Sequence, residues 1–221
     1  MSKELFVRAI TRFVAGVILL GVLLFAPAGT FRYPQAWIFM GILFIPMFGA
    51  GLVMMAKNPE LLEKRLNVKE KESEQRSVIL FSGIMFLAAF LTAGFCFRFN
   101  FLMLPFPVSC AAAVIFLLGY ALYAEVLREN TYLSRTVEVQ ENQKVVDTGL
   151  YGIVRHPMYM TTLIIFLMMP LILGSVISFV IMLAYFPIIT KRIKNEEADG
   201  TRRSRLAHQP VPVSDVQQKR R

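Results

Sequence analysis

Long apolar runs alternate with shorter polar segments along this chain. About 20 apolar residues are enough to cross the hydrocarbon core of a bilayer. Five apolar runs come close to this length or exceed it, at about 13–28, 36–56, 78–97, 105–127 and 160–190. Since lipid offers no water to the backbone, each segment must satisfy its own hydrogen bonds, which favours helices. The pattern therefore predicts an all-α integral membrane protein.

The last run, 160–190, is longer than one span needs and too short for two full spans. Pro170, Gly174 and Ser175 fall near its middle, where a helix is easily interrupted. We therefore expect a tight helical hairpin over 160–190, which gives about five to six transmembrane helices. The hairpin also returns the chain to the side of the membrane from which this run starts.

Basic residues indicate how these helices are oriented. The chain is 56% hydrophobic with a net charge of +9, and its mean hydropathy is +0.55. Lys and Arg gather before the first run, in 57–77, in 128–159 and after 190, whereas the other two loops hold only Arg32 and Arg98. The positive-inside rule then predicts that both termini, the loop 57–77 and the segment 128–159 are cytoplasmic.

This topology, together with anionic membrane lipids, explains the positive charge better than nucleic acid does. No basic patch is interleaved with stacking aromatic residues in a polar domain. Membrane lipids are thus the expected surroundings, while the oligomeric state stays open. The sequence does not distinguish a bacterial inner membrane from the endoplasmic reticulum.

The N-terminal segment 1–28 and the two cysteines of the apolar runs have simple structural explanations. Residues 1–28 resemble a signal peptide, but their end reads Ala26-Pro27-Ala28, and proline in this tripeptide disfavours cleavage. We expect the segment to be retained as the first helix. Cys96 and Cys110 lie in or beside apolar runs and are expected to pack as small apolar residues, since no metal-ligand or disulfide spacing surrounds them.

The polar segment 128–159 holds most of the chemically versatile side chains. Alternation at 136–140, followed by turn signals, predicts a small cytoplasmic cap. The segment ends in Arg155-His156-Pro157-Met158-Tyr159, and proline favours the first turn of a helix. His156 is then expected at a helix N-terminus, which suits a carboxylate or phosphate. Spacing alone equally allows a histidine and tyrosines that only anchor the membrane interface.

A second group of residues follows the hairpin. Arg192 and Glu196 are four residues apart and share a helix face. One interpretation is a surface ion pair of little energetic weight. If the hairpin forms, however, both residues return to the membrane face that holds His156. A site there would place a cation against Glu196 and an anion against Arg192 or the helix N-terminus.

The two groups together resemble the isoprenylcysteine carboxyl methyltransferase family and related phospholipid methyltransferases. The resemblance rests on Arg155-His-Pro-Met-Tyr159, the preceding 145–151, and Arg192-x-x-x-Glu196-Glu197 after a hairpin-length run. It covers about 105–197. It implies an S-adenosylmethionine pocket facing the cytoplasm and capped by the segment before the hairpin. It also implies a lipophilic acceptor that enters sideways from the bilayer.

The resemblance assigns roles residue by residue. Arg192 matches a position near the substrate carboxylate, and Glu196 matches a cofactor-binding acid. The other matches to cofactor-contacting positions are Gln140, Gln143, Lys144, Val145, Val146, Tyr151, His156, Pro157, Met158 and Tyr159. Methyl transfer to a carboxylate needs no general base, because the acceptor is already ionised at pH 7. The protein then mainly aligns and desolvates the reactants.

The chain departs from the family pattern after the two glutamates. Family members usually continue with a helical segment containing Tyr and Phe that folds back on the site, whereas Ala198-Asp-Gly200 breaks this pattern here. Residues 198–221 are basic, contain Pro210 and Pro212 and lack aromatic side chains, so we expect a disordered tail. The predicted organisation is a single membrane domain over 1–197 followed by this tail.

The sequence therefore predicts a membrane methyltransferase that uses S-adenosylmethionine to O-methylate an isoprenylcysteine-like or other lipophilic carboxylate. Two enzymatic alternatives remain: a methyltransferase of phospholipid or other lipid amines, and an NADPH-dependent membrane reductase of the steroid-reductase type. Gly149-x-x-Gly152 lacks the spacing of a dinucleotide fingerprint. A non-enzymatic protein whose site has decayed is a further alternative. Apolar helix faces do not reveal which acceptor is used.

Overall fold

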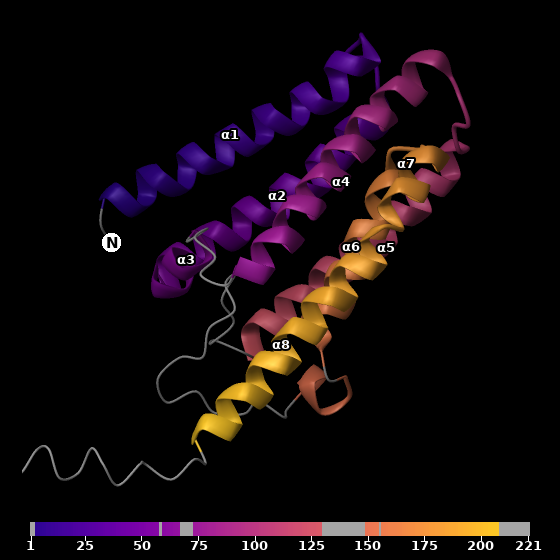
Figure 1. The fold of residues 1–221 in the computed structure, drawn as a ribbon. Coiled ribbons are helices and arrows are strands. Elements are labelled where there is room, and N and C mark those ends of the chain that lie inside the picture. The colour runs from indigo at the N-terminus through magenta and orange to yellow at the C-terminus, as the bar shows by residue number, and fades with distance from the viewer. Residues whose placement is uncertain (1–2, 58, 67–72, 130–148, 155, 208–221) are drawn as a thin grey trace, which may run out of the picture.

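The computed structural model describes residues 3–57, 59–66, 73–129, 149–154 and 156–207. The described chain consists of helices joined by short connections (Figure 1). In chain order they are α1 (Lys3–Ala28), α2 (Pro34–Lys57), α3 (Pro59–Leu66), α4 (Ser73–Phe99), α5 (Phe106–Glu129), the 3₁₀ helix η1 (Gly149–Gly152), α6 (Pro157–Ile172), α7 (Val176–Met182) and α8 (Tyr185–Ala207).

The predicted transmembrane helices are confirmed. Within the described residues, five segments are long and apolar enough to cross a membrane. They are α1, α2, α4, α5, and α7 together with α8 as far as Ala198, while α6 is a shorter apolar helix of 16 residues. Because α6 turns sharply into α7 at Gly174, the hairpin expected over 160–190 is present. The protein is therefore an all-α integral membrane protein.

The connections lie at the two ends of the bundle. The N-terminus, α3, η1 and the C-terminal part of α8 lie at one end, and the α1–α2, α4–α5 and α6–α7 connections lie at the other (Figure 1). This matches the alternation of basic residues along the chain. We call the first of these the basic end; its assignment to the cytoplasm stays a prediction from charge.

Small residues let neighbouring helices approach closely. A Cβ added at Gly94 of α4 would lie 2.7 Å from the carbonyl oxygen of Leu24 in α1, so only glycine fits there. A Cβ at Gly119 of α5 would lie 3.1 Å from Ile165 of α6. Around these contacts, one core of fully buried side chains links α2 and α5 through Phe39 and Phe116.

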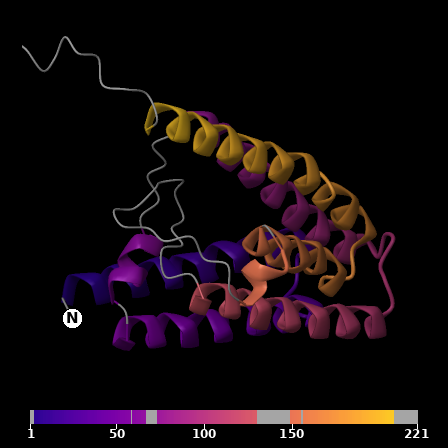
Figure 2. The ribbon, with the colours of Figure 1, turned by 90° about the horizontal axis from the view of Figure 1, so that it is seen from below.

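A second core brings α4, α6 and α8 together. It contains Met85, Tyr159, Met182, Tyr185 and Ile189. Figure 2 shows α8 beside α4 along one side of the bundle. This core fixes the start of α6 against the middle of α8, which positions the residues considered below.

Backbone hydrogen bonds tie the α6–α7 turn to the loop before α5. Leu104 donates its N–H to the carbonyl of Gly174 at 2.7 Å, and Val176 donates to the carbonyl of Leu102 at 3.3 Å. The buried hydroxyl of Tyr33 also donates to the carbonyl of Leu173 at 2.6 Å. The N-terminal end of α5 and the C-terminal end of α6 therefore lie at the same level along the bundle.

α8 continues through Ala198–Gly200 to Ala207. One glycine in a helix costs only about 1 kcal/mol relative to alanine. The residues after it include Arg, Leu and Ala, which favour helix, so the cost is offset. The structure thus describes 198–207 as helix, where the sequence favoured a disordered tail, and 208–221 lie outside the described residues. The division into a domain over 1–197 and a tail stays a prediction.

Candidate functional site

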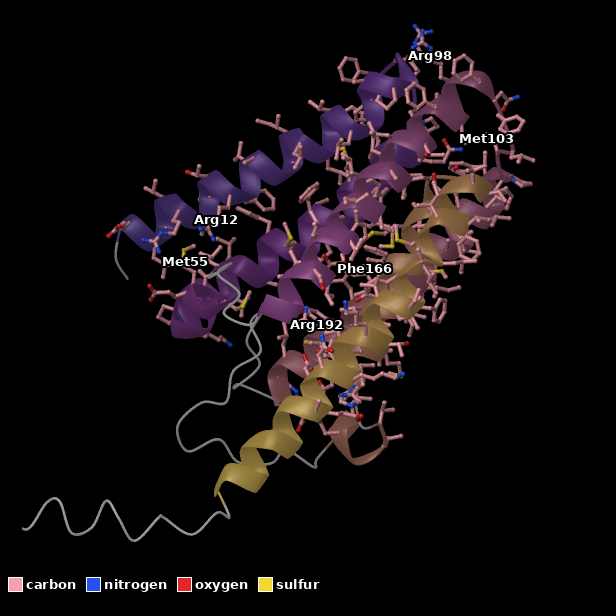
Figure 3. All side chains as sticks on the ribbon, viewed as in Figure 1. Arg12, Met55, Arg98, Met103, Phe166 and Arg192 are labelled. Carbon is pink, nitrogen blue, oxygen red and sulfur yellow. The ribbon has the colours of Figure 1, made fainter. Side chains whose placement is uncertain are left out.

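The start of α6 and the middle of α8 meet at the basic end of the bundle. α6 contributes His156 and Tyr159, and α8 contributes Arg192, Glu196 and Glu197. Figure 3 shows Arg192 on the inner side of α8, facing the bundle. The sequence predicted this meeting only on condition that the hairpin formed. The structure shows that it does.

Tyr159 lies at the centre of this cluster. Its side chain is buried, and its hydroxyl donates a hydrogen bond to Oε1 of Glu196. The hydroxyl oxygen of Tyr159 in turn accepts a hydrogen bond from Nε of Arg192 at 3.1 Å. Nε also lies 3.5 Å from Oε1 of Glu196. One tyrosine hydroxyl therefore fixes an acid and a base relative to each other.

The pair of Arg192 and Glu196 is not the exposed surface ion pair that the sequence alone allowed. Their side chains are 19% and 24% exposed. The guanidinium carbon of Arg192 lies 5.8 Å from the centre of the Tyr159 ring, within the range of a cation–π contact. Charges held this far from water require partners, and each partner here comes from another helix or an adjacent turn.

His156 extends the cluster toward the end of the bundle. Its Nε2 lies 3.3 Å from Oε1 of Glu197, and its ring centre lies 5.8 Å from that of Tyr159. A carboxylate only accepts hydrogen bonds, so Nε2 must carry the proton in this contact. His156 is also the N-cap residue of α6, although its side chain makes no capping hydrogen bond.

The N-terminus of α6 offers fewer free donors than the sequence suggested. Pro157 has no N–H, and it occupies the first helical position. Tyr159 and Met160 both donate their N–H groups to the carbonyl of His156, at 3.1 and 3.2 Å. Most of the polar chemistry at this end therefore comes from side chains.

The remaining predicted residues fall into two groups. Pro157 is buried, Met158 packs against the second core, and Tyr151 is half-buried on η1. Pro157 and Met158 form the start of α6, and Tyr151 lies on the 3₁₀ helix that precedes it. The predicted cofactor residues Gln140, Gln143, Lys144, Val145 and Val146, and most of the expected cap, lie outside the described residues.

Asn195 lies between the two motif residues of α8, and no pattern in the sequence selects it. Its side-chain nitrogen is buried and has no hydrogen-bond partner in the part of the chain that the structure describes. Buried donors without partners are unusual and often indicate a missing ligand group. Glu197 belongs to the motif of α8, although the resemblance assigns it no separate role.

The charges of the described cluster favour a cation. With His156 neutral, Glu196 and Glu197 oppose the single guanidinium of Arg192, which leaves one net negative charge. Asn195, the residue before Glu196 on α8, has a buried donor without a partner among the described residues. The cluster is therefore suited to a ligand that carries both a positive centre and hydrogen-bond acceptors. S-Adenosylmethionine has this combination, so the residues present fit it.

The fold and this cluster define an all-helical integral membrane protein with a polar site between the start of α6 and the middle of α8. Residues 111–200 match the isoprenylcysteine carboxyl methyltransferase (ICMT) family. The match runs from α5 into α8 and contains every described residue of the cluster. It confirms the resemblance to this family and indicates a membrane methyltransferase. Comparisons with curated proteins and with solved structures found no match.

Proposed function

We propose that the protein transfers a methyl group from S-adenosylmethionine to the carboxylate of a lipophilic, isoprenylcysteine-like substrate. The observation that carries this proposal is the hydrogen-bonded group of Tyr159, Glu196 and Arg192 within the segment that matches the family. It combines a buried negative charge with a guanidinium at one membrane-embedded position.

The acids of α8 have the charge required by the methyl donor. When bound, S-adenosylmethionine supplies an electrophilic methyl group on a sulfonium centre. Glu196, oriented by Tyr159, would attract this positive centre, and Glu197 with His156 would extend the polar surface. The buried amide nitrogen of Asn195 would donate to an acceptor of the same ligand. Each of these residues would bind or orient, and none needs to take up a proton.

Arg192 is suited to the acceptor carboxylate. The guanidinium has five N–H donors in a planar fork that matches a carboxylate. Tyr159 and Glu196 contact its Nε, which fixes the plane of the group before any substrate arrives. Because a carboxylate is ionised at pH 7, alignment and exclusion of water are the main tasks of the protein.

The membrane-embedded fold supports a lipophilic acceptor. A hydrocarbon chain reaches a site between helices more readily from the bilayer than through water. The basic residues at the same end of the bundle favour a cytoplasmic site under the positive-inside rule. This assignment and the identity of the acceptor belong to the proposal.

Calorimetry on the purified full chain tests the proposal. Wild type should bind S-adenosylmethionine, and Glu196→Gln should weaken binding at least tenfold, because it removes the net negative charge. Glu125→Gln is the matched control, since this acid is paired with Arg128 on the surface of α5. Failure of folded wild type to bind S-adenosylmethionine would refute the proposed cofactor.

Transfer of a radioactive methyl group to farnesylcysteine identifies the acceptor class. Arg192→Gln should reduce kcat/KM for this acceptor more than it reduces cofactor affinity, whereas Lys191→Gln should change neither. Lys191 lies on the exposed side of α8 beside Ser77. Transfer to lipid amines in a membrane extract, with none to farnesylcysteine, would contradict carboxylate methylation and leave the cofactor assignment intact.

A further inference from the structure

A cavity of about 410 Å³ lies between α1, α2, α3 and α5, apart from the candidate site. Among the described residues that line it, none comes from η1, α6, α7 or α8. Figure 3 shows Arg12 and Met55, which belong to its lining, toward the end of the bundle that also holds Arg192. Arg98 and Met103 lie at the opposite end. The cavity is therefore at the basic end but is not part of the methyl-transfer cluster.

The lining of the cavity is almost entirely hydrocarbon and thioether. Met47, Met54 and Met55 of α2 contribute to it, and methionine adapts its shape to irregular ligands. The volume falls in the range of about 300–1,000 Å³ that is typical of ligand pockets. Apolar cavities far smaller than this already bind small hydrocarbons and exclude water. Its chemistry thus requires an apolar occupant.

The surface of the bundle gives that occupant a route of entry. Phe48 and Leu52 line the cavity and are also 41% and 45% exposed. Both belong to α2, which is one of the membrane-spanning helices. An apolar chain therefore enters from the surrounding bilayer, without passing through water.

One charge gives the cavity a polarity. Arg12 is the only charged residue in the described lining, and its guanidinium donates to the carbonyl of Leu66 at the end of α3. No Asp or Glu of the described chain shares the lining. A guanidinium beside an apolar cavity at the basic end of a membrane protein is suited to an anionic lipid headgroup. Tyr120 lines the cavity too, but its hydroxyl donates to the carbonyl of Leu43.

We propose that this cavity binds one hydrocarbon chain of an anionic phospholipid, with Arg12 at its headgroup. Two observations favour a membrane lipid over the methyl acceptor: the cavity has its own cation, and no residue of the Tyr159 cluster lines it. The lipid would occupy the space between the N-terminal helices and α5. α1, α2 and α3 lie outside the segment that matches the family, whereas most of α5 lies inside it.

Glycines of α2 provide a matched pair of variants for the test. A Cβ added at Gly51 meets no atom within 4 Å, and Gly51 lines the cavity. A Cβ added at Gly49 also meets nothing within 4 Å, but Gly49 does not line the cavity. Gly51→Phe therefore fills the cavity, whereas Gly49→Phe makes the same chemical change elsewhere on the helix. Ala124→Leu is a milder filling variant for use if Gly51→Phe does not fold.

Native mass spectrometry of the purified full chain measures the bound lipid. Dioleoyl phosphatidylglycerol should bind at least tenfold more tightly than dioleoyl phosphatidylcholine. Gly51→Phe should abolish this binding, and Arg12→Gln should abolish the preference for the anionic lipid. Gly49→Phe and Arg8→Gln should behave as wild type, since Arg8 pairs with Glu4 and does not line the cavity.

Two results would overturn the proposal. Equal lipid binding by Gly51→Phe and Gly49→Phe would show that lipid only coats the outer surface. Displacement of the phospholipid by N-acetyl-S-farnesylcysteine, with the same sensitivity to Gly51→Phe, would assign the cavity to the acceptor. Neither readout depends on methyl transfer, so the result does not depend on the proposed activity.

Discussion

Removing the hydroxyl of Tyr159 tests the proposed role of the cluster most directly. Tyr159→Phe keeps the buried ring and its packing but deletes the atom that joins Glu196 to Arg192. Glu196 then loses the donor that orients its carboxylate. We expect the variant to fold and to bind S-adenosylmethionine more weakly, because the acid is no longer held in one position.

The size of the effect follows from the two hydrogen bonds that are lost. A hydrogen bond to a charged group contributes about 1.5–3 kcal/mol. The two contributions do not add in full, because Nε of Arg192 stays close enough to Glu196, at 3.5 Å, to pair with it directly. The loss is therefore that of about one such bond, which corresponds to roughly 10- to 100-fold in affinity.

Isothermal titration calorimetry on purified protein measures this loss, and thermal unfolding measures stability in parallel. Tyr33→Phe is the matched control, because Tyr33 is equally buried and donates to the carbonyl of Leu173 at the other end of the bundle. It should lower stability by about 1 kcal/mol and leave the affinity for S-adenosylmethionine unchanged.

The reasoning fails if Tyr159→Phe binds S-adenosylmethionine as wild type does while Glu196→Gln does not. That result would mean that the carboxylate acts without being oriented by the hydroxyl. A loss of affinity in Tyr33→Phe as large as in Tyr159→Phe would attribute the effect to general destabilisation instead.

Two further predictions concern glycines that set the fold. Gly94→Ala should separate α1 from α4 and lower the unfolding free energy by about 1–3 kcal/mol, since its Cβ would lie 2.7 Å from the carbonyl oxygen of Leu24; Gly83→Ala on the same helix, with nothing within 4 Å, should be neutral or stabilising by thermal unfolding. Gly174→Ala should cost about 1–2 kcal/mol, because φ is +76° in the hairpin turn; an unchanged melting temperature would contradict the strain.

The helices could be predicted because lipid leaves the backbone few alternatives. Spans and their order follow from the apolar runs, and Pro170, Gly174 and Ser175 located the hairpin. The continuation of α8 through Ala198–Gly200 could not be predicted in this way. Outside lipid, a helix ends only when local costs exceed the favourable propensity of its neighbours, and one glycine among strong helix formers does not reach that limit.

Several residues of the described cluster could be selected from the sequence, but their contacts could not. Spacing placed Arg192 and Glu196 on one face of a helix, yet nothing in it indicated that Tyr159 would bond to both. Such contacts depend on how α6 and α8 pack, which is set by buried residues far apart in the chain, such as Met85 and Tyr185. Asn195 shows the same limit, since an unpartnered amide becomes visible only in three dimensions.

The short length of α6 determines how far below the membrane surface the cluster around Tyr159 lies. At 1.5 Å per residue, α6 measures about 24 Å and α5 about 36 Å. Backbone hydrogen bonds hold the C-terminal end of α6 beside the N-terminal end of α5. The hydrocarbon core is about 30 Å thick. If α5 spans it fully, His156 and Tyr159 lie several ångströms beneath the membrane surface. A bilayer-resident acceptor would then meet the polar cluster at its own depth, without being lifted into water.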